Sequence, residues 1–315
     1  MQVLNTVGPL ILVVALGTIL FRTQFLPAAV FKANSRLVYW IGLPCLLFEK
    51  TAQPLENLSD AMAIFVVLLA GMLVSLALAY ATAKVLRVTP WAFGSFLQTA
   101  FRGNLAYAGL PVIFFALAET GDGGASAREA LAVLAIAPLV PIYNLIAVAV
   151  LVASQSRGGP KRGVDWSQIV RKTLTNPLII ACVLGLGWSL TGRDLPLLIL
   201  RPCRTIGGMA LPLALFSIGA SLRLEFLHRR VALPLASSII KVVLTPAAGY
   251  VIGRALGLSD KELCIAVIFL SCPTAVVSYI MAEEMSGDLE LTAAGIIMST
   301  LLVVPVWVVA LWLLA

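Results

Sequence analysis

Two basic residues lie deep inside apolar stretches of the chain, where a charged side chain needs a partner. Arg102 lies about twelve residues into an apolar run from about Trp91 to Ala118. Lys241 lies about halfway along another run, in the sequence SSIIKVVLTPAAG. A charge at the centre of a bilayer costs roughly 2.5–3.5 kcal/mol on insertion scales, and such charges mark functional sites. Each cation therefore either binds backbone carbonyls as a structural clamp or balances the charge of a bound solute.

The stretch around Arg102 reads FRGNLAYAGLP and is poorly suited to a continuous helix. Gly103, Gly109 and Pro111 weaken or break a helix, and Pro111 leaves the carbonyl four residues before it without its helical partner. Asn104 places a polar amide beside the break. In lipid such a break survives only where protein or a water-filled cavity satisfies the freed groups. We interpret the stretch as a discontinuous transmembrane helix whose gap is a binding site.

A second stretch, FLSCPTAVVSYIMA, carries a similar signal late in the chain. Pro273 is expected to free the carbonyl of Phe269. Ser271, Thr274 and Ser278 are small polar groups that can satisfy a broken backbone or contact a solute. The simpler interpretation is a proline kink without a ligand. A matching pair of interrupted segments in two halves of a chain favours a substrate site.

Further polar groups follow two prolines in the stretch APLVPIYNLI. Tyr143 and Asn144 could each hydrogen-bond a solute from the bent helix. An interhelical hydrogen bond is the alternative for both.

The charge balance of the apolar runs indicates the sign of the solute. No Asp or Glu lies in the middle of any run, whereas Arg102 and Lys241 do. Half-helix N-termini pointing into the gap would add positive potential. We therefore expect an anionic, carboxylate-bearing solute as the counter-ion. The absence of deep acids argues against a cation pump or a sodium–proton antiporter, where buried acids usually carry the ion.

The composition places the whole chain in a membrane. Of its 315 residues, 60% are hydrophobic and 12% charged, whereas a soluble domain carries about 25% charged residues. The apolar segments are too long and uninterrupted for a β-barrel, whose strands alternate over about 10 residues. The net charge of +7 comes from basic residues in short loops, so it does not indicate nucleic-acid binding. The predicted partner is the lipid bilayer.

The cysteines indicate neither a metal site nor a disulfide framework. No C-x-x-C motif or Cys/His cluster occurs, and the chain has a single histidine, His228. The five cysteines lie in or next to apolar segments and are interpreted as small core residues: Cys45, Cys182, Cys203, Cys264 and Cys272. No cofactor and no metal is predicted.

The apolar runs predict an all-α integral membrane protein with ten spans. The only substantial hydrophilic loop, around 156–174, divides them five and five. The predicted spans are approximately Val7–Leu26, Leu37–Glu49, Ala61–Lys84, Trp91–Ala118, Arg128–Ala153, Thr175–Leu190, Thr205–Leu222, Val231–Gly253, Leu263–Ala282 and Leu291–Leu314. The excess of Lys and Arg in alternate loops predicts both termini outside the cytoplasm and the central loop inside it.

The two halves of the chain, 1–155 and 175–315, resemble each other in sequence. A shift of about 168 positions aligns residues that are rarely matched by chance: Pro9 with Pro177, Gly17 with Gly185, Pro44 with Pro212 and Phe48 with Phe216. Because five spans is an odd number, the second half must enter the membrane from the opposite side. The pattern predicts two inverted five-helix repeats, joined by the 156–174 linker, with a site near the midplane. Pro44 and Pro212 are expected to kink the second and seventh spans.

Several stretches resemble the auxin efflux carrier family, over nearly the whole chain. These are FRGNLAYAGLP, TNPLIIACVLGLGWSL, MALPLALFSIGASL and SCPTAVVSYIMAEE. The resemblance implies crossing broken helices in the fourth and ninth spans, beside a panel domain, in an architecture similar to that of bile-acid symporters. It also implies transport of organic anions, which are auxin in plants and dicarboxylates such as malate or malonate for some bacterial relatives.

The resemblance matches particular residues of this chain to motif positions of the family. The family's fourth-span asparagine falls on Asn104 and its crossover proline on Pro111. The ninth-span crossover proline falls on Ser278, with Pro273 five residues earlier, so the second crossover is expected to differ in shape. The acid and lysine that plant members carry early in the third span are absent from AMAIFVVLLAGMLV. The short central loop is more similar to that of a bacterial permease.

Together these features predict a secondary carrier in the cell (inner) membrane that moves a mono- or dicarboxylate or an auxin-like acid by alternating access. Asn104 would orient the carboxylate, Arg102 or Lys241 would balance its charge, and Tyr143 and Asn144 would line the cavity. A channel or sensor on a transporter scaffold is the alternative, and a membrane-embedded enzyme is a more remote one. The sequence leaves open whether the protein forms a homodimer.

Overall fold

The computed structural model describes residues 2–52, 58–118, 125–155, 175, 177–221 and 231–314. Within these ranges the chain is helical, and an isolated bridge between Gly103 and Thr274 is its only extended pairing. The central loop 156–174, predicted to link the two repeats, lies outside the described residues. Three of the elements are short π-helical turns, η1 (Val38–Gly42), η2 (Leu105–Gly109) and η4 (Ile240–Leu244).

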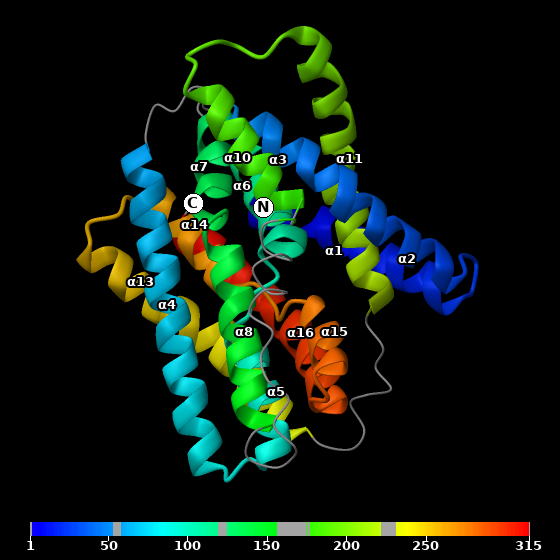
Figure 1. The fold of residues 1–315 in the computed structure, drawn as a ribbon, viewed down its shortest axis with the longest axis vertical. Coiled ribbons are helices and arrows are strands. Elements are labelled where there is room, and N and C mark those ends of the chain that lie inside the picture. The colour runs from blue at the N-terminus through cyan, green and yellow to red at the C-terminus, as the bar shows by residue number, and fades with distance from the viewer. Residues whose placement is uncertain are drawn as a thin grey trace. The chain divides into compact units, whose positions relative to one another are not determined.

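The α-helices follow the predicted apolar runs, often as two pieces in place of one (Figure 1). In the first half they are α1 (Gln2–Arg22), α2 (Ala28–Leu37), α3 (Leu43–Thr51), α4 (Leu58–Val85), α5 (Pro90–Phe101), α6 (Leu110–Ala118), α7 (Ala125–Ile136) and α8 (Leu139–Gln155). In the second half they are α10 (Pro177–Ser189), α11 (Leu197–Ser221), α12 (Ala232–Ile239), α13 (Thr245–Ala255), α14 (Asp260–Ser271), α15 (Val277–Glu284) and α16 (Leu289–Leu314).

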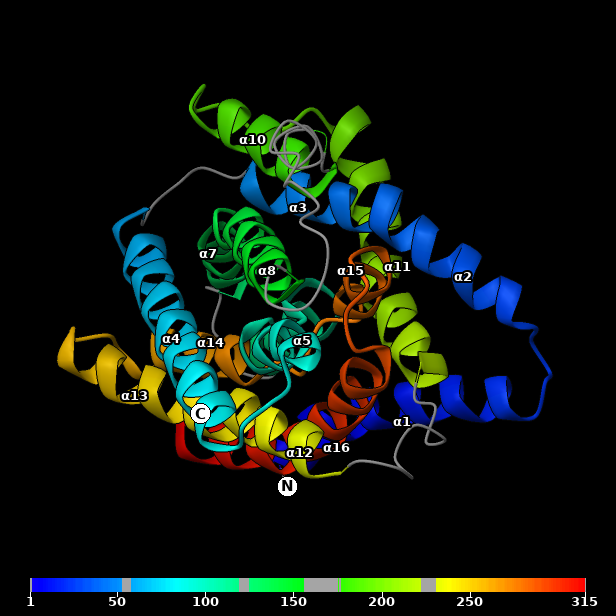
Figure 2. The ribbon, with the colours of Figure 1, turned by 60° about the horizontal axis from the view of Figure 1, so that its bottom comes forward.

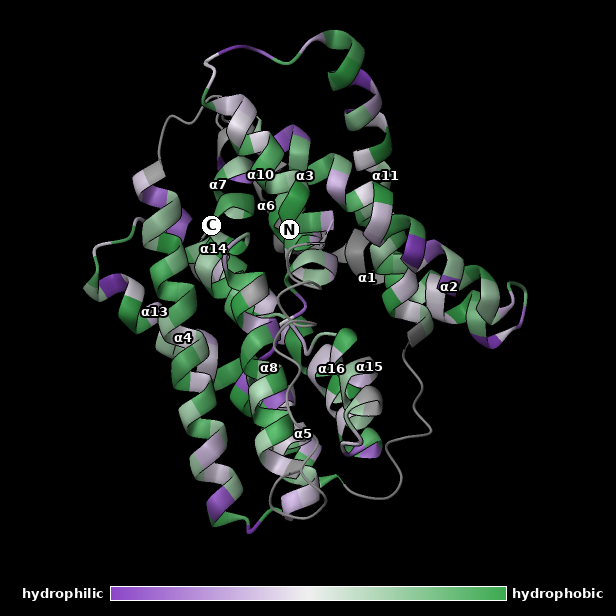
Figure 3. Ribbon diagram, in the orientation of Figure 1, coloured by the Kyte–Doolittle hydropathy of each residue, from purple (hydrophilic) through white to green (hydrophobic). Residues whose placement is uncertain are grey.

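Four of the described helical stretches are long and apolar enough to cross a membrane. They are Ser59–Val85, Leu197–Ala220, Ala232–Ala255 and Leu289–Trp312. In Figure 3, α4 is hydrophobic along most of its length and hydrophilic at its ends, as expected for a span that ends in the headgroup regions. The chain is therefore a multi-pass membrane protein, while the number ten and the inverted repeat stay predictions.

Each π turn lies just before a proline. The turns η1, η2 and η4 end two residues before Pro44, Pro111 and Pro246. Proline has no N–H, and its ring clashes with the carbonyl four residues back. The residue before Pro44 donates to the fifth residue back, and so does the residue before Pro246. The wider π spacing thus lets the helix continue past the proline, and Pro44 does not interrupt its segment. Pro212 lies inside a continuous α11.

The fifth predicted span, Arg128–Ala153, is two helices. The turn at Ala137 and Pro138 separates α7 from α8. The cause is the proline, which is disfavoured inside a helix because it removes a hydrogen bond. The apolar run was continuous across the break, so hydropathy alone gave one span.

The described chain forms two compact units, and each draws on both halves of the sequence. The first contains Met1–Met62, Ala106–Pro138 and Val170–Leu222; the second contains Ala63–Leu105, Leu139–Ile169 and Arg223–Ala315. The chain passes from the second unit to the first between Leu105 and Ala106, directly after the break in the fourth predicted span. The compact units are thus a different division of the chain from the predicted repeats.

In the first unit, α1 packs tightly along α11 (Figure 1). A Cβ on Gly17 would lie 2.1 Å from the carbonyl oxygen of Phe216, and one on Gly219 would lie 2.0 Å from that of Val14. Both glycines therefore allow the two backbones to approach. The Thr18 hydroxyl donates to the carbonyl of Gly219 at 2.9 Å. Small residues and such hydrogen bonds are the usual means of joining helices in a membrane.

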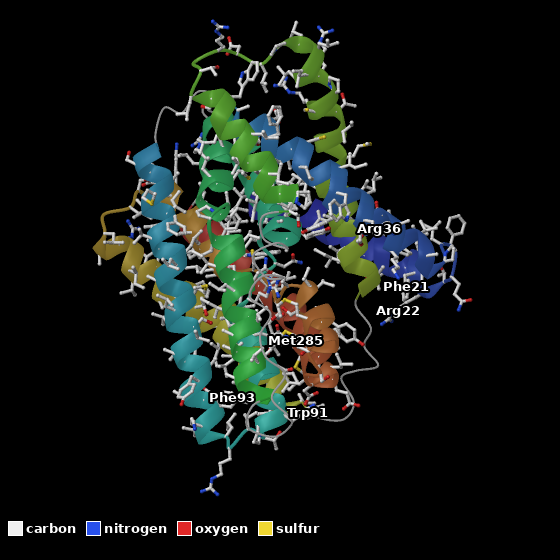
Figure 4. All side chains as sticks on the ribbon, in the orientation of Figure 1. Phe21, Arg22, Arg36, Trp91, Phe93 and Met285 are labelled. Carbon is white, nitrogen blue, oxygen red and sulfur yellow. The ribbon has the colours of Figure 1, made fainter. Side chains whose placement is uncertain are left out.

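In the second unit, α5 lies beside α8 in both ribbon views (Figures 1 and 2). The Gly94 amide donates to the Ser154 hydroxyl at 3.0 Å, and a Cβ on Gly94 would lie 2.9 Å from the Cα of Leu151. Near the start of α5, where Figure 4 labels Phe93, this ring packs edge-on against Tyr80 of α4 with centroids 5.7 Å apart. These contacts fix α5, which leads directly into the fourth-span break.

Candidate functional site

Two helix breaks meet in the second unit and form one backbone joint, which we call the crossover (residues 102–104 and 272–276). The helix α5 ends at Phe101, and Arg102 is extended (φ −83°, ψ 106°). The helix α14 ends at Ser271. The two extended segments pair antiparallel: the Asn104 amide donates to the carbonyl of Pro273 at 2.8 Å, and the Ala275 amide donates to that of Arg102 at 3.0 Å. The two broken chains thereby satisfy each other's backbone.

Two details of the predicted breaks were wrong. Pro111 does not mark the gap, because it lies in the first turn of α6 and the preceding π turn accommodates it. The gap lies at residues 102–104, and its middle residue, Gly103, has no side chain. The carbonyl of Phe269 is not freed by Pro273, since the Cys272 amide donates to it at 3.2 Å as the helix tightens in its last turn.

Lys241 is completely buried beside the crossover. Its Nζ donates to the carbonyl of Leu270 at 2.6 Å. A Cβ placed on Gly103 would lie 3.2 Å from the same Nζ, so the ammonium sits against the extended segment. In the described ranges no carboxylate lies within ion-pair distance of Nζ, and Leu270 supplies its one hydrogen-bond acceptor. An ammonium has three donors, and Leu270 accepts from only one of them.

Arg102 is also buried, with 6% of its surface exposed. Its guanidinium donates to the Asn144 side-chain oxygen and to the sulfur of Met281. These partners lie on α8 and α15, so the guanidinium joins three elements of the unit. The structure thus brings Arg102 and Asn144 together, and both of these partners are side-chain atoms, whereas the predicted structural clamp would bind freed backbone carbonyls.

Asn104 and Tyr143 lie at the edge of the crossover. Asn104 is 8% exposed, and its side-chain amide forms no hydrogen bond with any residue that the structure describes. The Tyr143 ring stacks on Phe101 with centroids 5.9 Å apart, and its hydroxyl interacts with the backbone of Gly103. The side-chain amide of Asn104 can therefore use its donors and its acceptor to bind another partner.

The hydroxyl groups of Ser271 and Thr274 both form hydrogen bonds within the protein. The Thr274 hydroxyl donates to the carbonyl of Thr99 at 2.7 Å. The Ser271 hydroxyl donates to a carbonyl of its own helix and accepts from the Trp307 indole at 3.0 Å. Ser299 accepts from the Thr274 amide at 2.9 Å. These contacts make α5, α14 and α16 a frame around the two breaks.

Sequence reasoning missed Gln98, one turn before Arg102. Its side-chain nitrogen donates to the carbonyl of Ser278 at 2.9 Å, and the side chain is completely buried. The Gln98 side-chain oxygen and the Ser278 hydroxyl are both buried without a hydrogen-bond partner in the described chain. The missed signal was an amide in the apolar sequence GSFLQTAF. The predicted crossover residue Gly109 lies in η2, outside the crossover itself.

The crossover therefore combines paired extended backbone with a buried ammonium and an amide that is free to bind. Such a site can take a small anionic group, because the Lys241 ammonium and the Asn104 side-chain amide both supply N–H donors. The Cys, His, Asp and Glu side chains that the structure describes form no group of three that could hold a metal ion.

A family model described as "Membrane transport protein" matches residues 2–312, from the start of α1 to two residues before the end of α16. The chain belongs to this transporter family. The resemblance to auxin efflux carriers found in the sequence is thereby confirmed, since members of that group are among the relatives of the chain.

Relatives of this membrane transport protein occur in archaea and plants. It is 22% identical over 287 residues to an uncharacterized transporter of Methanocaldococcus jannaschii, and the match covers 88% of each chain. It is 29% identical over 153 residues to an uncharacterized transporter of Methanothermobacter thermautotrophicus, covering 47% of this chain and 50% of the relative. It is 29% identical over 152 residues to probable auxin efflux carrier component 9 of Oryza sativa, covering 46% of this chain and 35% of the relative. The last two matches thus span half or less of the relatives' length.

Proposed function

We propose that the protein is a secondary carrier for a small organic anion that bears a carboxylate. The observation that carries the proposal is Lys241: a completely buried ammonium with one described acceptor, lying against Gly103. Leaving a cation in an apolar interior costs several kcal/mol unless it is paired. A bound carboxylate would supply the missing pair and two strong acceptors for the remaining donors.

In this proposal Asn104 orients the carboxylate and Lys241 neutralises it. The Asn104 amide can donate to one carboxylate oxygen while the ammonium binds the other. Arg102, tied to Asn144 and Met281, contributes positive potential and holds the frame. Tyr143, whose ring stacks on Phe101, would contact the solute from α8. Ser271 and Thr274 act mainly through the shape of the crossover, because their hydroxyl protons already have acceptors.

Transport would proceed by alternating access, with the crossover exposed first to one side of the membrane and then to the other. Family membership supports a transporter. The discontinuous helices support a site at the crossover, since irregular backbone at membrane depth usually lines a binding cavity. The orientation with both termini outside the cytoplasm belongs to the same proposal and rests on the loop charges. The names of the plant relatives make auxin-like aromatic acids candidates beside mono- and dicarboxylates.

The test is ligand-dependent thermal stability of the purified protein, followed by counterflow in vesicles. Mono- and dicarboxylates, auxin-like acids, amines and inorganic cations are compared at one pH and one ionic strength. Binding to the folded state raises the apparent stability by mass action. We expect stabilisation by a few acids, its loss in Asn104→Ala, and saturable counterflow of the same acids. Stabilisation by amines or cations but by no acid would refute the anion proposal, and flux without counterflow would indicate a channel.

A further inference from the structure

The outer face of α2 and η1 in the first unit carries cations at one end and apolar side chains at the other. Lys32 and Arg36 are both exposed. They lie four residues apart on the continuous helix α2, which places their Cβ atoms about 5–6 Å from each other. Leu37, Trp40 and Ile41 follow them and are also exposed. We call these residues the α2 strip, with a basic end (Lys32 and Arg36) and an apolar end (Leu37, Trp40 and Ile41).

The opposite side of α2 and η1 is packed against the rest of the first unit. Phe31 and Val38 are buried there. The Asn34 side-chain amide donates to the carbonyl of Leu213 at 2.9 Å and to the hydroxyl of Ser217 at 2.7 Å, both on α11. Because these contacts fix the rotation of α2 about its axis, the α2 strip faces away from the unit.

The end of α1 adds a further cation beside the basic end of the strip. The Phe21 ring packs edge-on against Phe31 with centroids 5.6 Å apart. Arg22 and Lys32 are the residues that directly follow these two rings, and both are exposed. Figure 4 labels Phe21, Arg22 and Arg36 on these two helices. Arg22 therefore adds its positive charge to that of the basic end.

These cations have no acidic partner in the part of the chain that the structure describes. No ion pair there involves Arg22, Lys32 or Arg36. Residues 1–48 contain no Asp or Glu at all, so α1, α2 and η1 cannot supply one themselves. Exposed apolar side chains alone would indicate only contact with bulk lipid. Unneutralised cations at the end of such a face indicate a lipid whose headgroup is negatively charged.

We propose that the α2 strip binds one anionic phospholipid. The phosphodiester accepts hydrogen bonds from the Lys32 ammonium and the Arg36 guanidinium, and Arg22 adds positive potential. An acyl chain packs along the apolar end. Tryptophan lies preferentially at the level of the headgroups, so Trp40, about one turn beyond Arg36, marks the boundary between headgroup and chain. A zwitterionic lipid binds less well, because its own ammonium already balances the phosphate.

The test is thermal unfolding of the purified full chain in a neutral detergent. Phosphatidylglycerol, phosphatidylcholine and soluble glycerol phosphate are each added at increasing concentration, and binding to the folded state raises the unfolding temperature. We expect phosphatidylglycerol to act at the lowest concentration. Lys32→Gln/Arg36→Gln should need about 30-fold more of it, at about fivefold for each cation. Without lipid this variant should unfold at the normal temperature, because both side chains are exposed.

The matched control removes the same charge elsewhere in the same unit. Arg193 and Arg201 are exposed and lie before and at the start of α11, whereas α2 contacts α11 further on, at Leu213 and Ser217. Arg193→Gln/Arg201→Gln should therefore respond to phosphatidylglycerol as the unaltered protein does.

Four outcomes would overturn the proposal. Equal stabilisation by phosphatidylcholine would show that the headgroup charge does not matter, and equal weakening in the Arg193→Gln/Arg201→Gln protein would indicate an effect of net charge alone. Unchanged affinity in Lys32→Gln/Arg36→Gln would place the lipid elsewhere. Stabilisation by soluble glycerol phosphate at the concentrations at which phosphatidylglycerol acts would show a site for phosphate without a lipid chain.

Discussion

Replacing Gly103 by alanine tests whether the solute binds beside Lys241 at the crossover. The added Cβ would lie 3.1 Å from a methyl carbon of Leu105, 3.2 Å from Nζ of Lys241 and 3.3 Å from its Cε. All three contacts are with side-chain atoms, so they can relax by a few tenths of an ångström. The methyl group would then occupy the surface through which the ammonium meets a bound carboxylate.

The expected cost to binding is much larger than the cost to folding. A hydrogen bond to a charged group contributes about 1.5–3 kcal/mol, and each 1.4 kcal/mol changes the dissociation constant about tenfold. Losing one ammonium–carboxylate contact should therefore weaken binding by about 10- to 150-fold. The extra methyl group should lower the free energy of unfolding by about 1 kcal/mol or less, since it also restricts the unfolded chain.

The assay is thermal unfolding of Gly103→Ala with increasing concentrations of the acid that most stabilises the unaltered protein. Gly295→Ala is the matched control, because its Cβ would meet Thr99 at 3.2 and 3.3 Å and does not approach Lys241. Both variants should fold, and only Gly103→Ala should need a much higher acid concentration for the same shift. Unchanged affinity in a folded Gly103→Ala protein, or an equal loss in Gly295→Ala, would refute the reasoning.

Three further substitutions test other parts of the argument. Lys241→Met should abolish stabilisation by acids. It should change the free energy of unfolding by less than about 2 kcal/mol, because the lost hydrogen bond is offset by removing a buried charge. A Lys241→Met protein that is unfolded in the absence of ligand would instead show that the lysine is structural. Ser278→Ala removes a buried hydroxyl that lacks a described partner and should raise the free energy of unfolding by about 1 kcal/mol. A lower free energy of unfolding, measured by chemical denaturation, would show that the hydroxyl has a hydrogen-bond partner. Gly207→Ala should cost about 1–3 kcal/mol because its Cβ meets the backbone of Leu46 at 2.9 Å, while Gly208→Ala, which meets nothing within 4 Å, should unfold at nearly the normal temperature.

The sequence by itself determined the class of the protein and the region of its candidate site. Long apolar runs with few charges have no stable arrangement in water, so they indicated a multi-pass membrane protein. Gly103 and Asn104 marked the interruption in the fourth predicted span, because glycine and a polar amide are costly inside a lipid-facing helix. Lys241 was identified by the energetic cost of burying an isolated charge.

Only the tertiary structure decided where the chain is interrupted and how the freed groups are satisfied. Pro111 looked like the gap, but a π turn accommodates it, because hydrogen-bond register depends on the neighbouring turns. The bridge between Gly103 and Thr274 joins segments that no local pattern connects. The hydrogen bond that Arg102 donates to Asn144 depends on packing in the same way. Periodicity and propensity act over a few residues, whereas these contacts depend on which distant helices share an interior.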